Sequence, residues 1–314
     1  MSTPDGPAFD LVDGRPVVLT PRTVLPDGRT AEAATVRRYL PTRGRRMVGA
    51  WCFLDLFGPD DVRGEAGMQV APHPHCGLQT VTWLLAGDVR HRDSLGSDQL
   101  IRPGQLNLMS AGHGIAHAEN SPVAHGDSLF GVQLWVALPD AERAGEPFFS
   151  HHPDLPAWQR TGLDGRVLLG EYDGVRSPAR VFSPLTAVQL SFGPASAADL
   201  PLRADWEYAL LVVEGELLVP DGPLAPSAFA YLGTSRTSLA VSSPDGATVL
   251  LLGGEPFAEE IVMWWNFVAR SHTEIAQARQ AWAAGERFGP VRYPGDRLDA
   301  PPLPAVTLKP RGRV

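Results

Sequence analysis

The chain has 314 residues, a formal net charge of −8 at pH 7 and a hydrophobic fraction of 44%. It is therefore long enough for two domains and apolar enough to fold over most of its length. No basic run exceeds the cluster at Arg43, Arg45 and Arg46, which argues against direct nucleic-acid binding through a broad positive face. The 32 glycines and 30 prolines favour short strands and turns over long helices.

Several features indicate the cellular compartment. Residues 1–7 are polar, unlike a signal peptide, and no apolar run approaches the roughly 20 residues of a membrane span. Two cysteines, Cys52 and Cys76, make no disulfide framework; we expect Cys76 to be a core thiol, with a metal ligand as the alternative. These features predict a cytoplasmic protein without a membrane segment. Lys309 is the only lysine among 27 basic residues, which is typical of a GC-rich, bacterial genome.

The first half of the chain predicts short strands in close succession. After a loose arm at 1–34, with one strand around Val17–Val24, apolar or alternating runs are separated by turns that contain Gly, Pro or Asp. The expected strands are 35–40, 47–57, 70–75, 78–85, 89–94, 105–109, 115–120 and 129–138. This spacing is typical of an antiparallel sandwich or barrel.

A second series of strands follows a break in the pattern. Residues 139–158 are rich in proline and charge and lack a period. We therefore expect a first domain at 1–140, a linker at 141–158 that exposes His151 and His152, and a second domain at 159–314. The strands expected in the second domain are 166–170, 181–182, 187–192, 207–213, 215–219, 228–232, 237–241 and 247–253.

The two series share a weak internal repeat. Glu207–Val219 resembles Thr80–Val89, because each has an apolar strand, a Gly-centred turn and a second strand. The repeat suggests two copies of one barrel. No histidine lies between His152 and His272, so the second barrel cannot repeat a histidine-rich site.

The C-terminal part predicts one helix. In the helix expected at Ser271–Ala284, Ser271 serves as N-cap with Glu274 three residues later, and Gly285 ends the helix. One face carries Ile275, Ala278 and Trp282 and should pack on a barrel. The aromatic run at 263–268 should pack on a barrel as well, and the tail after Pro290 should be extended.

Two pairs of polar residues stand out in the first series. In a strand, residues two apart point to the same face. His73 and His75 can therefore direct two imidazoles at one point, and His117 and Glu119 an imidazole and a carboxylate. Three nitrogens and one oxygen suit a divalent first-row metal such as iron, nickel, copper, zinc or manganese. The alternative is that these are scattered polar residues on strand edges.

Five segments together resemble the pirins, a family of bicupins. They are APHPHCGLQTVTWLLAG at 71–87, HRDSLG at 91–96, MSAGHGIAHAEN at 109–120, GVQLWVALP at 131–139 and MWWNFVARSHTEI at 263–275. The resemblance implies an all-β fold: two double-stranded β-helix (cupin) barrels in tandem with a short C-terminal helix. It also implies one metal ion in the first barrel, held by His73, His75, His117 and Glu119, and none in the second barrel.

The resemblance implies two possible functions. The first is a quercetin 2,3-dioxygenase-like enzyme that cleaves a flavonol-type substrate with O₂, with Glu119 as metal ligand and catalytic base. The second is a metal- or redox-sensing regulator that binds a protein partner. The metal expected is Fe²⁺, with Ni, Cu, Mn, Co or Zn as alternatives. We expect a monomer whose partner is a small flavonol-like molecule or a protein, and not a nucleic acid or a membrane.

Two positions depart from the family pattern. Gln79 replaces an acidic residue that is frequent four positions after the second histidine, and Leu56 replaces a histidine that often follows the equivalent of Asp55. These changes put the charge near the metal and one supporting contact in doubt.

Other polar residues have two interpretations each. His113 is either a substrate contact or a turn residue, and His91 with Asp93 either orients a ligand through a hydrogen bond or forms a salt link at a strand edge. Candidates for cavity lining, with core packing as the alternative, are Met109, Leu134 and Trp135. His125 and His272 are expected at the surface or at a cap.

Overall fold

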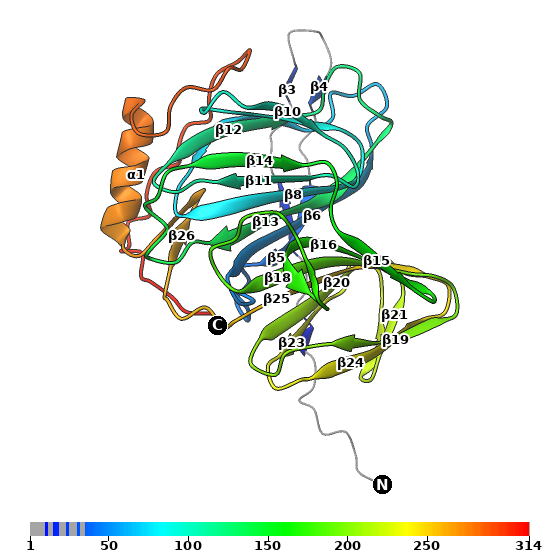
Figure 1. Cartoon of the computed structure of the whole chain (residues 1–314). Helices are drawn as coiled ribbons and strands as arrows, with labels where there is room; N and C mark the ends of the chain where they lie inside the picture. Colours follow the sequence, from blue (N-terminus) through cyan, green and yellow to red (C-terminus); the bar gives the residue numbers. More distant parts are fainter. Residues whose placement is uncertain (1–9, 12–14, 19–22, 25–29, 32–34, 314) are drawn as a thin grey trace.

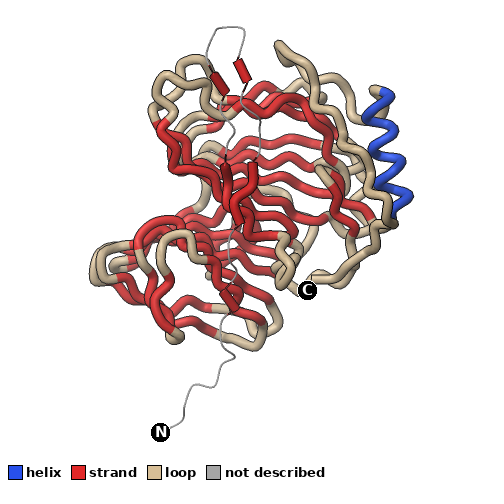
Figure 2. The backbone as a smooth tube through the Cα atoms, turned by 180° about the vertical axis from the view of Figure 1, so that it is seen from behind, coloured by secondary structure: helices blue, strands red, loops and turns tan. Residues whose placement is uncertain are grey.

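The computed structural model describes residues 10–11, 15–18, 23–24, 30–31 and 35–313. They form two β-barrels, one above the other in Figure 1, and one helix at the edge of the first barrel. Figure 2 shows the same two stacks of strands from behind. Parts of the loose arm expected at 1–34 lie outside the described residues.

The first barrel consists of a large and a small antiparallel sheet. The large sheet has the order β14-β11-β8-β13-β6-β5-β2 and the small sheet β10-β9-β12-β7. Their bounds are β2 Arg15–Val18, β5 Thr35–Leu40, β6 Trp51–Asp61, β7 Gln69–His75, β8 Leu78–Ala86, β9 Val89–Asp93, β10 Asp98–Ile101, β11 Leu106–Ser110, β12 Ile115–Asn120, β13 Ser128–Ala137 and β14 Phe148–His152.

The second barrel repeats this plan. Its large sheet has the order β1-β23-β20-β25-β18-β16-β15, with β17 on β16, and its small sheet β19-β24-β21-β22. The bounds are β1 Asp10–Leu11, β15 Ala157–Arg160, β16 Leu163–Tyr172, β17 Val175–Arg176, β18 Leu185–Phe192, β19 Ser196–Pro201, β20 Glu207–Gly215, β21 Leu217–Val219, β22 Gly222–Leu224, β23 Phe229–Gly233, β24 Ser238–Ser243 and β25 Ala247–Gly254. β8 and β20 hold equivalent places in the two sheets, as the internal repeat predicted.

The two large sheets pack against each other. Trp83 of β8 and Leu211 of β20 belong to one buried cluster that joins both barrels, and the Trp83 indole donates a hydrogen bond to Gln189 Oε1 at 2.8 Å. Each large apolar side chain buried there contributes about 1.5–3 kcal/mol. β8 is buried on both faces over most of its length, because one face meets the second barrel and the other fills the first.

The segment expected to be an irregular linker contains two strands. β14 pairs with β11 at the edge of the first barrel, where Phe149 stands opposite Met109, and β15 pairs with β16 of the second. The strand β14 has only five residues, which is too few to give a clear alternating pattern within a segment rich in proline and charge. We propose that the first barrel extends to His152 and that the second begins near Ala157.

The C-terminal segment returns to the first barrel, although the sequence assigned it to the second domain. β26 (Val262–Trp264) and β27 (Phe267–Ala269) form a hairpin, and a backbone bridge joins Phe267 to Cys76. Helix α1 (His272–Ala284) follows and packs beside the hairpin. A further small hairpin, β3 (Thr23–Val24) and β4 (Thr30–Ala31), belongs to the N-terminal arm.

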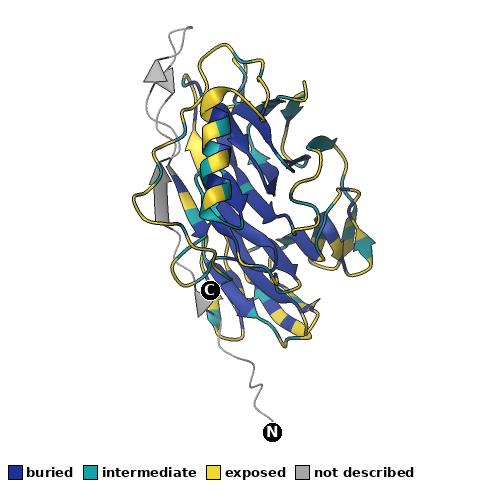
Figure 3. Cartoon of the chain, turned by 90° about the vertical axis from the view of Figure 1, so that its left-hand side faces the viewer, coloured by how far each residue is buried: buried dark blue, intermediate teal, exposed yellow. Residues whose placement is uncertain are grey.

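The helix has the predicted ends and face. The Ser271 side chain accepts a hydrogen bond from the Glu274 amide, and Gly285 at φ 76° adopts the left-handed C-cap conformation. Ile275, Ala278 and Trp282 are its buried residues, and its exposed outer face is visible in Figure 3. Among the described residues, no helix is both long and apolar enough to cross a membrane.

Candidate metal centre

Three histidines meet on the inner face of the small sheet of the first barrel. β12 lies between β7 and β9, and His117 stands opposite His73 on one side and Asp93 on the other. His75 is two residues beyond His73 and therefore points to the same face. The ligand nitrogens of His73, His75 and His117 all lie within 4.8 Å of one another, so the period-two spacing does bring them together.

The nitrogen positions fit a metal ion. His75 Nε2 and His117 Nε2 are 3.1 Å apart, and two ligands at about 2.1 Å from one ion and at right angles would be separated by about 3.0 Å. His73 Nδ1 faces the Ala71 carbonyl at 2.9 Å, and His75 Nδ1 faces the Asn266 carbonyl at 3.2 Å. Because carbonyls only accept, both Nδ1 atoms carry the proton and both Nε2 lone pairs face the cluster.

Burial keeps these imidazoles neutral. Desolvation lowers the pKa of His73 to about 4. It also lowers the pKa of His75 and of His117 well below the ordinary histidine value, and the neighbouring histidines add to the effect. Neutral imidazole is the form that binds a metal, so all three are competent ligands at pH 7.

Glu119 lies close to the histidines, but its carboxylate is bound by Thr82 of the neighbouring sheet. A register shift separates His117 from Glu119 on β12, and the Thr82 hydroxyl donates to Glu119 Oε1 at 3.0 Å. Its carboxylate shares a 4.8 Å group with His117 and His91 rather than with His73. Burial raises the pKa of Glu119. Its assignment as the fourth ligand stays a prediction.

A cavity of about 370 Å³ opens onto the cluster. One wall is aromatic: the rings of Phe53 and Trp135 stack at 4.0 Å and 12°, and the Arg38 guanidinium lies 4.3 Å from the Phe53 centroid. Arg38 also makes a two-bond ion pair with Asp55, at 2.8 and 2.7 Å. The other residues that line the cavity are Phe57, Met68, Val70, His73, His75, His117, Glu119, Gln133, Trp265, Asn266 and Leu298.

Comparison with known proteins identifies the family. The family models named Pirin and Pirin C-terminal cupin domain match residues 33–136 and 187–289. The chain is 50% identical to a Pseudomonas aeruginosa protein named "Putative quercetin 2,3-dioxygenase" over 86% of each chain. It is 37% identical to a "Pirin-like protein" of Caulobacter vibrioides over 85% of this chain and 94% of that protein. The chain belongs to the pirin family.

A solved structure supports the pirin fold. The crystal structure of quercetin 2,3-dioxygenase from Acinetobacter baumannii superposes with a TM-score of 0.89 at 40% identity, over 96% of this chain and 97% of that one. The tandem cupin barrels expected from the sequence are therefore confirmed.

The positions that depart from the pirin pattern both face away from the histidine cluster. Gln79 is fully buried, and its amide donates to the Arg180 carbonyl at 3.1 Å. Leu56 is buried in the cluster between the barrels, whereas Asp55 beside it on β6 lines the cavity. Neither substitution changes the set of side chains that face the histidines.

The remaining candidate residues lie at the cavity, in the core, at the surface or on β14. Trp135 lines the cavity, whereas Met109 and Leu134 belong to the core. Three histidines make hydrogen bonds with the backbone at surface or cap positions: His113 with Gly145 O, His125 with Glu65 O, and His272 with the amide of Leu308. His151 contacts Asn107 at 2.8 Å from β14. Cys76 is a buried thiol whose pKa burial raises to about 11.

Sequence reasoning named Trp135 as a candidate for the cavity wall but missed Phe53 and the Arg38–Asp55 ion pair. Phe53, Asp55 and Phe57 alternate along β6, a period-two signal that marks them as one face. No local signal showed that this was the face toward the histidines, because β6 is apolar on both faces. Nothing in the sequence marked Thr82 as the partner of Glu119, or the Asn266 carbonyl as the partner of His75.

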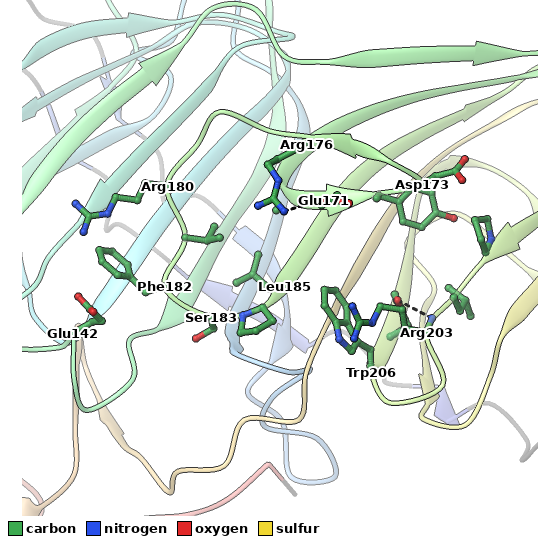
Figure 4. Close-up of a pocket in the computed structure, with 17 residues that line it drawn as sticks. Glu142, Glu171, Asp173, Arg176, Arg180, Phe182, Ser183, Leu185, Arg203 and Trp206 are labelled. Atoms are coloured by element: carbon green, nitrogen blue, oxygen red, sulfur yellow. Dashed lines mark hydrogen bonds and ion pairs between the residues drawn. The ribbon is translucent and has the colours of Figure 1, made fainter.

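A second, larger cavity of about 920 Å³ is lined mostly by the second barrel (Figure 4). Its size alone would make it the stronger candidate. However, no histidine or cysteine is among its lining residues, and acids pair with two of its arginines, Arg176 with Glu171 and Arg203 with Asp205. It therefore offers no histidine or cysteine ligand for a metal, and the smaller cavity remains the candidate metal centre.

Proposed function

We propose that this chain is a metal-dependent dioxygenase that opens a flavonol-type ring with O₂, as the names of its relatives indicate for them. The observation that carries the proposal is a cluster of three neutral, buried imidazoles at the base of an aromatic-walled cavity. Its volume falls within the usual range for small-molecule sites, about 300–1,000 Å³. The donor set suits several divalent metals; we propose iron, held by His73, His75, His117 and Glu119.

The residues around the cavity have separable roles. A bound metal supplies a positive charge for the ionised substrate oxygen and a centre for redox chemistry with O₂. The Phe53–Trp135 wall offers a flat surface on which a planar ring system can stack. Arg38 and Asp55 present a donor and an acceptor to phenolic hydroxyl groups.

Glu119 is proposed to take the proton of the flavonol hydroxyl group. Its raised pKa makes it a stronger base than an exposed carboxylate, and a pKa closer to the working pH improves general-base catalysis. The bond from Thr82 engages Oε1, which leaves Oε2 to face the substrate or the metal.

The test is oxygen consumption with quercetin by protein reconstituted with iron. Glu119→Gln keeps the shape of the side chain and removes the base, so we expect a loss of about 10²–10⁴-fold in turnover with part of the metal retained. Fully loaded protein that consumes no O₂ with any flavonol would rule out the enzyme.

One observation favours the regulator as the second candidate. A groove of about 500 Å³ is lined by Arg46, Lys309, Arg311 and apolar side chains such as Met47 and Val306, and none of its lining residues is acidic. In a chain of net charge −8, such a groove suits an acidic segment of a partner protein. Metal-dependent binding of a protein partner, without O₂ consumption, would support this candidate over the enzyme.

A further inference from the structure

Two successive hydrogen bonds connect the histidine cluster to a buried carboxylate. His117 Nδ1 lies 3.3 Å from His91 Nδ1, and His91 Nε2 lies 3.1 Å from Asp93 Oδ2. All three side chains are at most 3% exposed. Strand register explains the arrangement, because β9 runs beside β12 with Asp93 opposite His117 and His91 opposite Glu119.

Asp93 determines which atom donates in each hydrogen bond of this series. Its Oδ1 accepts the amides of Leu95 and Ser97 at 2.9 and 3.0 Å, which fixes the carboxylate in place. An ionised carboxylate only accepts, so the proton of a neutral His91 lies on Nε2. His91 Nδ1 then accepts, His117 donates from Nδ1, and the His117 Nε2 lone pair faces the cluster.

The opposite direction is incompatible with metal binding. If His91 donated from Nδ1, the proton of a neutral His117 would lie on Nε2. That proton would face His75 Nε2, 3.1 Å away, and occupy the space in which the proposed ion would bind. Only one of the two directions therefore leaves His117 able to act as a ligand.

The ring of His91 is also held from one side. Phe149 stacks on it with centroids 4.3 Å apart and an interplanar angle of 12°. Phe149 lies on β14, the strand that completes the edge of the large sheet. His91 is thus fixed at both nitrogens and on one face, which prevents it from rotating away from His117.

We propose that Asp93 and His91 are positioning residues that hold His117 in the tautomer with a free Nε2. The inference rests on the metal centre of the proposed function but not on its flavonol chemistry. Partners that orient a metal-binding histidine typically change metal affinity about 10–100-fold when they are replaced.

A competing arrangement uses the same atoms. The ligand atoms of His91, His117 and Glu119 also lie within 4.8 Å of one another, so a second ion could take the place of the proton between the two rings. In that case His117 would bind metal through both nitrogens, and His91 would be a ligand. The two arrangements predict one and two ions per chain.

The decisive variant is Asp93→Asn, measured by competition of zinc or cobalt with a chromophoric chelator. The introduced amide can donate to His91 Nε2, so that His91 donates from Nδ1 and the proton of His117 lies on Nε2. We expect metal affinity to fall about 10–100-fold. In ¹⁵N spectra of the zinc-loaded wild type, His117 should bind through Nε2 and carry its proton on Nδ1. The matched control is His113→Gln, outside the cavity, which should leave both readouts unchanged.

Two substitutions at His91 test the acceptor itself. His91→Phe can keep the stack on Phe149 but removes the acceptor, so affinity should fall as in Asp93→Asn. His91→Asn places an amide oxygen near the Nδ1 position and should recover most of the affinity. Wild-type affinity in Asp93→Asn and His91→Phe would overturn the proposal. Two metal ions per chain in the wild type and one in His91→Phe would also overturn the proposal. If the variants lose metal affinity as expected but the wild type never turns over a flavonol, the proposed dioxygenase function is refuted and the positioning role of Asp93 and His91 stands.

Discussion

Burial of His73 in its neutral form predicts a specific loss of stability in acid. Its pKa is about 4 in the folded protein and about 6.5 in the unfolded chain. Between these values the unfolded state binds more protons, so stability falls as the pH falls. From pH 7 to pH 5, this single group should lower the free energy of unfolding of the metal-free protein by about 2 kcal/mol.

The assay is urea unfolding of chelator-treated protein at pH 7, 6 and 5. Other groups also titrate over this range: burial lowers the pKa of His75 and His117 as well, whereas it raises that of Glu119. His73→Gln cannot titrate, so the contribution of His73 is the difference between the pH profiles of wild type and variant. Parallel profiles for the two proteins would refute the conclusion that His73 is buried and neutral, and with it one ligand of the proposed centre.

Three further predictions concern the ligands and the packing of the barrels. Elemental analysis should find one metal per chain, and His75→Ala should lower the occupancy far more than His113→Ala, because only His75 faces the cluster. Anomalous diffraction from metal-loaded crystals should place no metal within residues 160–256; a peak there would contradict the assignment to the first barrel. Trp83→Phe leaves Gln189 Oε1 without its donor between the barrels, so the free energy of unfolding should fall by about 1–3 kcal/mol in thermal or urea denaturation.

The histidine cluster and the helix were predictable because their signals are local. His73 and His75 stand two apart on one strand, and Ser271 and Glu274 stand three apart at a helix start. Strand and helix geometry convert such spacings directly into positions in space. The repeat of barrel architecture was visible for the same reason, as an apolar strand, a turn and a strand that occur twice.

Apart from Trp135, the walls of the cavity were not predictable, because they depend on how distant segments pack against each other. Phe53 and Trp135 stack across two neighbouring strands, but the choice of inward face on β6 follows from the packing of the second barrel. Phe149 gave no signal, since β14 is a short edge strand inside a segment rich in proline and charge. Register and closure, which no window of sequence contains, decide these contacts.

The hydrogen bond between His75 and the Asn266 carbonyl has a consequence for biosynthesis. The two residues are 191 positions apart, and Trp265 and Leu298 of the same C-terminal segment line the cavity. At about 5–20 residues per second, the ribosome needs about 10–40 s to reach Asn266 after it has made His75. During that time His75 lacks its orienting carbonyl and the cavity lacks one wall. Tight metal loading at the proposed centre should therefore follow the synthesis of Asn266 and the packing of its segment against the first barrel.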